Sequence, residues 1–148
     1  MTEILLDTNV LIYYHDAQSP EKQSQARLVL QQLIANKSGC VSAQNLAEFV
    51  SVALRKLKPP LTPSEALAEI SLLSSTLRVI DLNRNVVLEA ARGVRDYQLS
   101  YYDAQIWAAA RLNQISVIFS EDFQDGQIIE TVRFANPFGL NFNINEWL

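Results

Sequence analysis

Short apolar segments alternate with longer amphipathic segments along the chain, and this alternation is the strongest constraint on its fold. The short segments have the length and composition of buried strands. They cover residues 3–6, 40–43, 77–82, 116–120 and 131–135. Strands that alternate with helices are joined by right-handed crossovers, which gives a mostly parallel sheet with helices on both faces. The sequence therefore predicts an α/β protein.

The segments between these strands repeat apolar residues at three- and four-residue intervals, as helices with one buried face do. We expect helices over residues 21–36 and 46–57, a third starting at Thr62-Pro63, a fourth ending near Gln98 and a fifth starting after Ser100. The final segment NPFGLNFNINEWL lacks periodicity, so we expect an irregular arm. Because there is no repeat or obvious linker, residues 1–148 are expected to form a single domain.

The composition indicates a globular chain, with 49% hydrophobic and 19% charged residues. A formal net charge of −4 argues against nucleic-acid binding by bulk electrostatics, but it is compatible with a local basic patch or a bound cation. No apolar run reaches the ~18 residues of a membrane span. Glu3 and Asp7 stand where a signal peptide would carry positive charge. We therefore expect a cytoplasmic protein that does not associate with membranes.

Four acidic residues follow predicted strands, at the edge where α/β proteins bind ligands. Asp7 directly follows the first strand, and Asp122 follows the fourth. Glu48 lies in the first turns of the helix after the second strand, and Asp103 lies in the first turn of the fifth helix. Ligands of open α/β sheets sit beyond the carboxyl ends of the strands, so we expect these four carboxylates to share one site.

Two of these acids also have a structural interpretation at a helix start. Asp7 could cap a short helix beginning at Asn9. Asp103 could form a capping box with Ser100 and complement the helix dipole. Spacing alone does not choose between these roles and a shared site.

The remaining acids have equally plain alternatives. Asp122 and Asp125, beside Gly126, resemble ordinary loop acids. Glu48 points away from the apolar stripe of its helix, as a solvated glutamate would. Glu48 can therefore serve a site only if that helical face borders the cleft.

Convergence of the acids would require a cation, because neighbouring carboxylates repel one another and raise each other's pKa. Mg²⁺ and Mn²⁺ prefer carboxylate oxygen and water, and such ions promote in-line displacement at phosphorus. Cys40 and His15 are the only residues of their kinds, which excludes a disulfide, a cysteine cluster and a multi-histidine zinc site. The expected cofactor is therefore Mg²⁺ or Mn²⁺.

Four segments together resemble the PIN-domain ribonucleases, and more narrowly the VapC-type toxins of toxin–antitoxin pairs. They are DTNVLIYY at residues 7–14, AEFVSV at 47–52, LSYYDAQIWAAA at 99–110 and FSEDFQDG at 119–126. The resemblance implies a three-layer α/β/α sandwich and Mg²⁺- or Mn²⁺-dependent cleavage of RNA. It also implies a homodimer that is blocked by a small antitoxin protein.

The resemblance assigns the acidic quartet to Asp7, Glu48, Asp103 and Asp122, as catalytic residues and metal ligands. In this assignment Glu48 orients the attacking water or binds a second ion.

The same resemblance assigns supporting roles beside the quartet. Thr8 and Asn9 match hydrogen-bonding residues next to the first acid, and Ser120 matches the hydroxyl residue ahead of the last. Asp125 is a candidate fifth acid.

Contacts to RNA would need cations and aromatic rings. The densest basic run is Arg55, Lys56 and Lys58, which could hold phosphate or simply end a solvated helix. Tyrosines that could stack on bases lie near the acids in sequence, at positions 13, 14, 101 and 102. Each of these tyrosines is equally compatible with packing.

Two other functions compete with the nuclease. An aspartyl phosphotransferase or phosphatase would use Asp7 as nucleophile. The chain resembles the haloacid-dehalogenase-like enzymes at its first strand, but that resemblance implies a second aspartate where this chain has Asn9. A non-catalytic PIN-like scaffold would bind a partner without metal. The segment from Ser64 to Leu77 carries leucines that could supply an interface or pack on the sheet.

Overall fold

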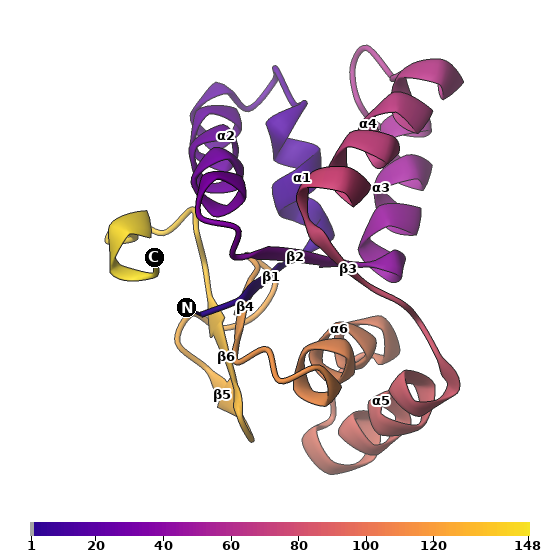
Figure 1. The fold of residues 1–148 in the computed structure, drawn as a ribbon, viewed down its shortest axis with the longest axis vertical. Helices are drawn as coiled ribbons and strands as arrows, with labels where there is room; N and C mark the ends of the chain where they lie inside the picture. The colour runs from indigo at the N-terminus through magenta and orange to yellow at the C-terminus, as the bar shows by residue number, and fades with distance from the viewer. Residues whose placement is uncertain (1) are drawn as a thin grey trace.

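A six-stranded sheet runs through the centre of the molecule, in the order β3-β2-β1-β4-β6-β5 (Figure 1). The structure is a computed structural model and describes residues 2–148. The strands are β1 (Ile4–Leu6), β2 (Gly39–Ser42), β3 (Arg78–Ile80), β4 (Val117–Phe119), β5 (Ile128–Ile129) and β6 (Val132–Ala135). All five predicted strands are confirmed, each within a few residues of its expected bounds.

The sheet is mostly parallel, as predicted. β1 pairs in parallel with both β2 and β4, and Leu5 lies opposite Cys40 on one side and Ile118 on the other. β3 and β6 extend the parallel sheet outward. β5, which the sequence did not predict, pairs antiparallel with β6 at one edge.

Helices cover both faces of the sheet, which confirms the three-layer α/β/α architecture (Figure 1). One face carries α1 (Thr8–Tyr14), α2 (Pro20–Ala35), α3 (Ala43–Arg55) and α4 (Pro63–Thr76). The other face carries α5 (Arg84–Tyr97) and α6 (Tyr101–Leu112).

Alternate strand residues feed two separate cores. Ile4 and Leu6 pack with the residues of α1 to α4, whereas Leu5 packs with the residues of α5 and α6. Trp107 of α6 is fully buried, and Ala108, Ala109 and Ala110 are buried beside it. Residues 104–110 of α6 are therefore all buried, because they lie between the sheet and α5. Since both faces of the sheet are covered, strand ends are the natural place for polar side chains.

Local capping fixes where the helices begin. Thr62 and Glu65 form a reciprocal capping box at the start of α4, and Asn83 caps α5. The suggested capping box of Ser100 is wrong, because its side chain makes no capping hydrogen bond at the start of α6. Asp103 therefore does not form a capping box with Ser100.

The C-terminal arm packs against the edge of the first core. It is irregular apart from a short 3-10 helix, Ile144–Glu146. Phe142 and Trp147 contact the ring of Phe119 edge to face, with ring centroids 5.2 and 5.4 Å away. Among residues 2–148 no helix has the length and apolar character needed to cross a membrane.

Candidate functional site

The site lies where the direction of strand order reverses. From β1 the chain builds β2 and then β3 on one side, and returns to place β4 on the other side of β1. The ends of β1 and β4 are tied together by a hydrogen bond from the Asp7 N–H to the Phe119 carbonyl, at 3.0 Å. This switch point is where open α/β sheets bind ligands, so the residues after these two strands define the candidate site.

Asp7 is buried at this point, with 3% of its surface exposed. It caps α1, and its Oδ1 accepts the Thr8 N–H at 2.7 Å. Its Oδ2 accepts the Ser120 hydroxyl at 2.6 Å. The suggested cap role is thus confirmed, with the helix beginning at Thr8, one residue earlier than expected.

The electrostatic state of Asp7 reflects its burial. Burial raises the pKa of Asp7 from 3.8 to about 6. The hydrogen bonds from Ser120 and Thr8 oppose this rise, and repulsion from Asp122 and Glu48 adds to it. Two other members of the predicted quartet, Asp122 and Glu48, therefore lie close enough to the end of β1 for their charges to raise the pKa of Asp7.

Glu48 faces this site instead of open water. Its Oε2 accepts the Thr8 hydroxyl at 2.9 Å, and its Oε1 accepts the Gln44 side-chain amide at 2.7 Å. Glu48 is half-buried, while its neighbour Ala47 is exposed. The alternative interpretation of Glu48 as a solvated glutamate is therefore wrong, because the flank of α3 opposite its apolar stripe borders the start of α1.

Asp103 and Asp122 complete the acidic edge. Asp103 is half-buried in the first turn of α6, and its carboxylate accepts no hydrogen bond from any of the described residues. Partial loss of hydration raises the pKa of Asp122, and repulsion from Asp103 and Glu121 raises it further. The Asn9 side chain opposes that rise by hydrogen bonding. The two acids are thus electrostatic neighbours.

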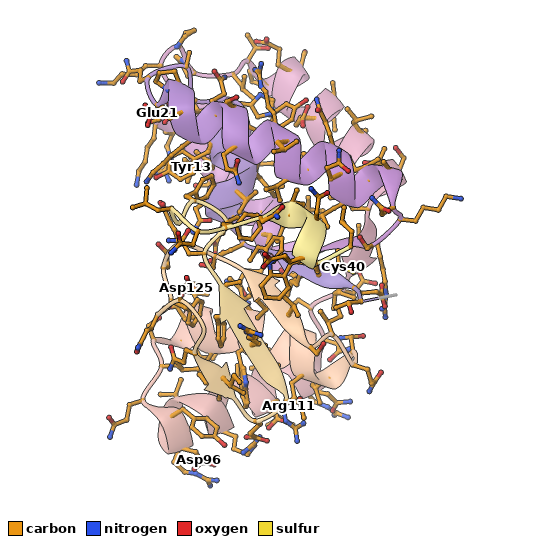
Figure 2. The ribbon with its side chains drawn as sticks, turned by 90° about the vertical axis from the view of Figure 1, so that its left-hand side faces the viewer. Tyr13, Glu21, Cys40, Asp96, Arg111 and Asp125 are labelled. Atoms are coloured by element: carbon orange, nitrogen blue, oxygen red, sulfur yellow. The ribbon has the colours of Figure 1, made fainter. Side chains whose placement is uncertain are left out.

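Asp125 is engaged elsewhere in the loop after β4. Its Oδ1 accepts the Asn136 N–H at 2.9 Å, which ties the loop to the end of β6. Asp125 and Tyr13 lie toward the same side of the molecule in Figure 2.

The predicted supporting residues lie between the acids. The Ser120 hydroxyl, besides donating to Asp7, accepts the Asp122 N–H at 3.0 Å. The Asn9 amide donates weakly to the same hydroxyl at 3.5 Å, and the buried Asn9 Oδ1 has no hydrogen-bond partner within residues 2–148. A buried oxygen without a partner is unfavourable unless a ligand or water satisfies it.

The donor set suits a hard divalent cation. Every polar group at this edge that could bind a metal is an oxygen, from four carboxylates and the unpaired Asn9 carbonyl. Within residues 2–148 no three acidic, histidine or cysteine side chains lie close enough to hold a metal in this conformation.

Sequence reasoning missed several polar residues behind the acids. Asn45 is fully buried and donates to Thr8 Oγ1 at 3.3 Å, while its own oxygen accepts from Ser42. Gln105 is a buried amide on an otherwise apolar helix and donates to Gln44 at 2.7 Å. A single polar residue inside an apolar helical face was the signal that could have revealed both.

A second missed group holds the loop that carries Asp122. Glu121 accepts the Tyr13 hydroxyl at 2.5 Å and the Lys22 ammonium at 2.8 Å. Lys22 also lies over the Tyr13 ring, 4.8 Å from its centroid. Tyr13 is therefore engaged within the fold and is not a free base-stacking ring.

The basic residues differ in their availability. Arg55, Lys56 and Lys58 are exposed at the end of α3. Arg92 instead lies in a network of ion pairs with Glu89, Asp96 and Glu130. Arg111 joins this network through Glu89 and Glu130. Arg111 and Asp96 lie at the α5–α6 end of the molecule, away from Tyr13 and Asp125 (Figure 2).

Comparison with known protein families identifies the family to which this fold belongs. The sequence model of the PIN domain matches residues 4–125, and the chain belongs to the PIN-domain family. A search of curated proteins gives no match.

Several solved structures share this fold. A toxin–antitoxin complex from Klebsiella pneumoniae superposes with a TM-score of 0.65 and 19% identity, over 91% of this chain and 98% of the other. The sarcin-ricin loop cleaving toxin VapC20 from Mycobacterium tuberculosis gives 0.64 and 22%, over 88% and 99%. DNA-bound VapBC from Salmonella typhimurium gives 0.64 and 21%, over 93% and 99%.

Proposed function

We propose that the chain is a Mg²⁺- or Mn²⁺-dependent endoribonuclease that cleaves RNA phosphodiester bonds by in-line attack of water. One observation carries the proposal: Asp7 is 3% exposed at the switch point, yet it senses the charges of Asp122 and Glu48. A buried acid surrounded by other acids destabilises a fold, and a divalent cation is what makes such an arrangement favourable.

The residues that would hold the cation are Asp7, Asp103 and Asp122, with Glu48 at the side of the site. The cation, when bound, lowers the pKa of a water molecule and stabilises the charge that develops at phosphorus. Ser120 fixes the rotamer of Asp7 through its 2.6 Å hydrogen bond, and Asn9 offers a buried oxygen beside it. Asp125 is proposed only as a peripheral acid, because it ties its loop to the end of β6 and is not among the acids whose charges raise the pKa of Asp7 or Asp122.

Glu48 would orient the attacking water and accept its proton. Both of its oxygens are held from the protein side, Oε2 by Thr8 at 2.9 Å and Oε1 by Gln44 at 2.7 Å. Each carboxylate oxygen can accept a further hydrogen bond, so one lone pair on each remains for a ligand. A side chain fixed in this way loses little further entropy when it engages water.

RNA would approach over the exposed residues beside the acids. Tyr101 and Tyr102 are 37% and 65% exposed at the start of α6, directly before Asp103, and unpaired bases stack on such rings. The exposed run at the end of α3, which includes Arg55 and Lys56, would contact phosphate.

We further propose that the chain is the toxin of a cytoplasmic toxin–antitoxin pair, forms a homodimer and is blocked by a small antitoxin protein. The shared fold with structures from three toxin–antitoxin complexes supports the partner. Leu73 of α4 and its C-cap residue Leu77 are used in the core, whereas Leu67 and Leu72 of α4 are 68% and 55% exposed and available for an interface. Co-purification with the product of a neighbouring small reading frame tests the pairing.

The test of catalysis is cleavage of a single-stranded RNA in Mn²⁺, in Mg²⁺ and in EDTA. We expect metal-dependent cleavage by the wild-type chain and a loss of at least 100-fold in Asp7→Asn and Asp122→Asn. Asp81→Asn, an exposed change in the loop after β3, is the matched control and should retain activity. Equal cleavage by the Asp7→Asn variant would overturn the proposal.

A non-catalytic scaffold is the alternative outcome of the same experiment. It would give no cleavage in any metal and no thermal shift on addition of Mn²⁺. The aspartyl phosphotransferase alternative is disfavoured, because position 9 carries an amide in place of an acid.

A further inference from the structure

Two buried glutamines lie behind Glu48 and connect two helices of the candidate site. Gln44 belongs to α3 and Gln105 to α6, and they are 8% and 5% exposed. Gln105 Nε2 donates to Gln44 Oε1 at 2.7 Å. Gln44 Nε2 in turn donates to Glu48 Oε1 at 2.7 Å and to the Tyr102 carbonyl at 3.1 Å.

The direction of these hydrogen bonds follows from the chemistry of the amide. An amide side chain has one accepting end and one donating end, so fixing one end fixes the other. Because Gln105 donates to the oxygen of Gln44, the NH₂ group of Gln44 must face Glu48. The opposite orientation would set an amide oxygen against a carboxylate oxygen, which is repulsive.

We propose that Gln105 and Gln44 form an amide relay that positions Glu48 for the proposed nuclease reaction. Neither glutamine needs to touch the substrate, so both are positioning residues. Gln105 acts only through Gln44, by keeping its donating end toward the carboxylate. This inference rests on the proposed function for the role of Glu48, although the relay itself can be tested without metal or RNA.

The relay also couples the helix that carries Glu48 to the helix that carries Asp103. Gln44 bridges the Glu48 carboxylate and the backbone of Tyr102, the residue directly before Asp103. Two like-charged side chains tend to move apart, and a neutral bridge between their helices opposes that movement. The relay therefore holds the two acids at a fixed separation before a cation binds.

The second oxygen of Glu48 is fixed by an independent chain of hydrogen bonds. Thr8 Oγ1 donates to Glu48 Oε2 at 2.9 Å and accepts from Asn45 Nδ2 at 3.3 Å. Asn45 is oriented in turn by Ser42, whose N–H and hydroxyl both donate to Asn45 Oδ1. Glu48 is thus held on both oxygens by side chains whose orientation is itself determined.

The first experiment measures unfolding by urea in EDTA for a double-mutant cycle of Gln105→Met and Glu48→Gln. Gln105→Met keeps the length and burial of the side chain but removes the donor, which lets the Gln44 amide turn over. In the Glu48→Gln background either orientation of Gln44 finds a partner. We therefore expect Gln105→Met to raise the unfolding equilibrium constant at least threefold more in the wild-type background.

Equal effects of Gln105→Met in the two backgrounds would overturn the relay, because a residue that only fills space cannot sense the charge at position 48. Should Gln105→Met not fold, Gln44→Met removes the donor to Glu48 directly and enters the same cycle. Gln31→Met, an exposed change on α2, is the matched control for introducing methionine and should show no coupling.

The second experiment measures Mn²⁺ affinity by calorimetry, and cleavage of a single-stranded RNA. For Gln105→Met we expect Mn²⁺ binding about tenfold weaker and kcat about tenfold lower, with KM for the RNA within about twofold. Wild-type Mn²⁺ affinity and kcat in this variant would overturn the positioning role. If the wild-type chain itself neither binds Mn²⁺ nor cleaves RNA, the proposed function fails while the metal-free cycle still decides the relay.

Discussion

Asp7→Asn should stabilise the metal-free protein, although it removes the central residue of the proposed site. Burial raises the pKa of Asp7 from 3.8 to about 6, so the folded state disfavours its ionised form. Asparagine has nearly the same shape, remains a good N-cap and carries no charge. The variant therefore avoids the cost of holding a buried carboxylate.

The magnitude follows from the difference between the two pKa values. At 1.36 kcal/mol for each pH unit between them, ionised Asp7 lowers the free energy of unfolding by about 3 kcal/mol. In a domain of this size that corresponds to roughly 6–12 °C in Tm. The value of about 6 already includes the hydrogen bonds from Ser120 and Thr8, which oppose the rise, so this free energy needs no separate correction for them.

The gain should depend on pH with a definite sign. A carboxylate with a raised folded pKa contributes stability below its unfolded value of 3.8, and that contribution is lost as the pH rises through about 6. The free energies of unfolding of the wild type and of Asp7→Asn should therefore be closest near pH 4, and their difference should reach its full value above pH 6. Asp81→Asn, which is exposed, should change the free energy of unfolding by less than about 0.5 kcal/mol at every pH.

The assay is urea unfolding in EDTA, between pH 4 and pH 8, followed by tryptophan fluorescence. A variant less stable than wild type at pH 7.5 would refute the reasoning, because hydrogen bonds to Asp7 would then outweigh the cost of its charge. A gain that does not vary with pH would refute it as well, since an effect of shape or propensity has no titration.

Three further changes have outcomes fixed by single contacts. Ser120→Ala removes the donor to Asp7, so the pKa of Asp7 should rise above about 6 and the free energy of unfolding at pH 7.5 should fall by about 2 kcal/mol in urea titration. Gly93→Ala places a methyl group 2.8 Å from the ring of Trp107, so it should lower the free energy of unfolding by about 1–2 kcal/mol despite the better helix propensity of alanine. Glu130→Gln removes a charged partner from Arg92 and Arg111, so it should lower the free energy of unfolding by about 1 kcal/mol at pH 7. Because the pKa of Glu130 is depressed to about 2 in the folded protein, this loss should shrink as the pH falls from 4.5.

Each of these changes has a result that would count against it. For Ser120→Ala it is a loss of stability at pH 4 as large as that at pH 7.5. For Gly93→Ala it is any gain in stability, which would mean that the Trp107 ring can shift without cost. For Glu130→Gln it is a cost that stays constant down to pH 2.

The strands that position the site were predictable because their signal is local. Each predicted strand is a short apolar run bounded by polar residues, and burial on both faces of a parallel sheet demands that composition. β5 (Ile128–Ile129) was not predicted, because two residues show no periodicity and the strand exists through its antiparallel pairing with β6. Its presence depends on tertiary contacts that no local pattern records.

The side-chain environment of the acids was less predictable than their position in the chain. The helical phase of Glu48 separates the core face of α3 from the opposite face, and it assumes that the opposite face meets water. Thr8 at the start of α1 covers that face by its hydrogen bond to Glu48. Gln44, one turn earlier on α3, does the same and is held in place by hydrogen bonds with residues of α6. The apolar periodicity of one helix does not reveal which residues from other parts of the chain will cover its polar face.

The cost of ionised Asp7 also sets how much metal the protein needs in order to recover its stability. A ligand that binds only the folded state stabilises it by RT ln(1 + [L]/Kd), which reaches about 3 kcal/mol near 160 times Kd. Asp7→Asn lacks the proposed ligand and should gain little from Mn²⁺. The variant should therefore be the more stable protein in EDTA, and the wild type should overtake it as Mn²⁺ is titrated beyond that ratio. Equal thermal shifts of the two proteins in Mn²⁺ would show that Asp7 is not a metal ligand, and the burial of its charge would then need another explanation.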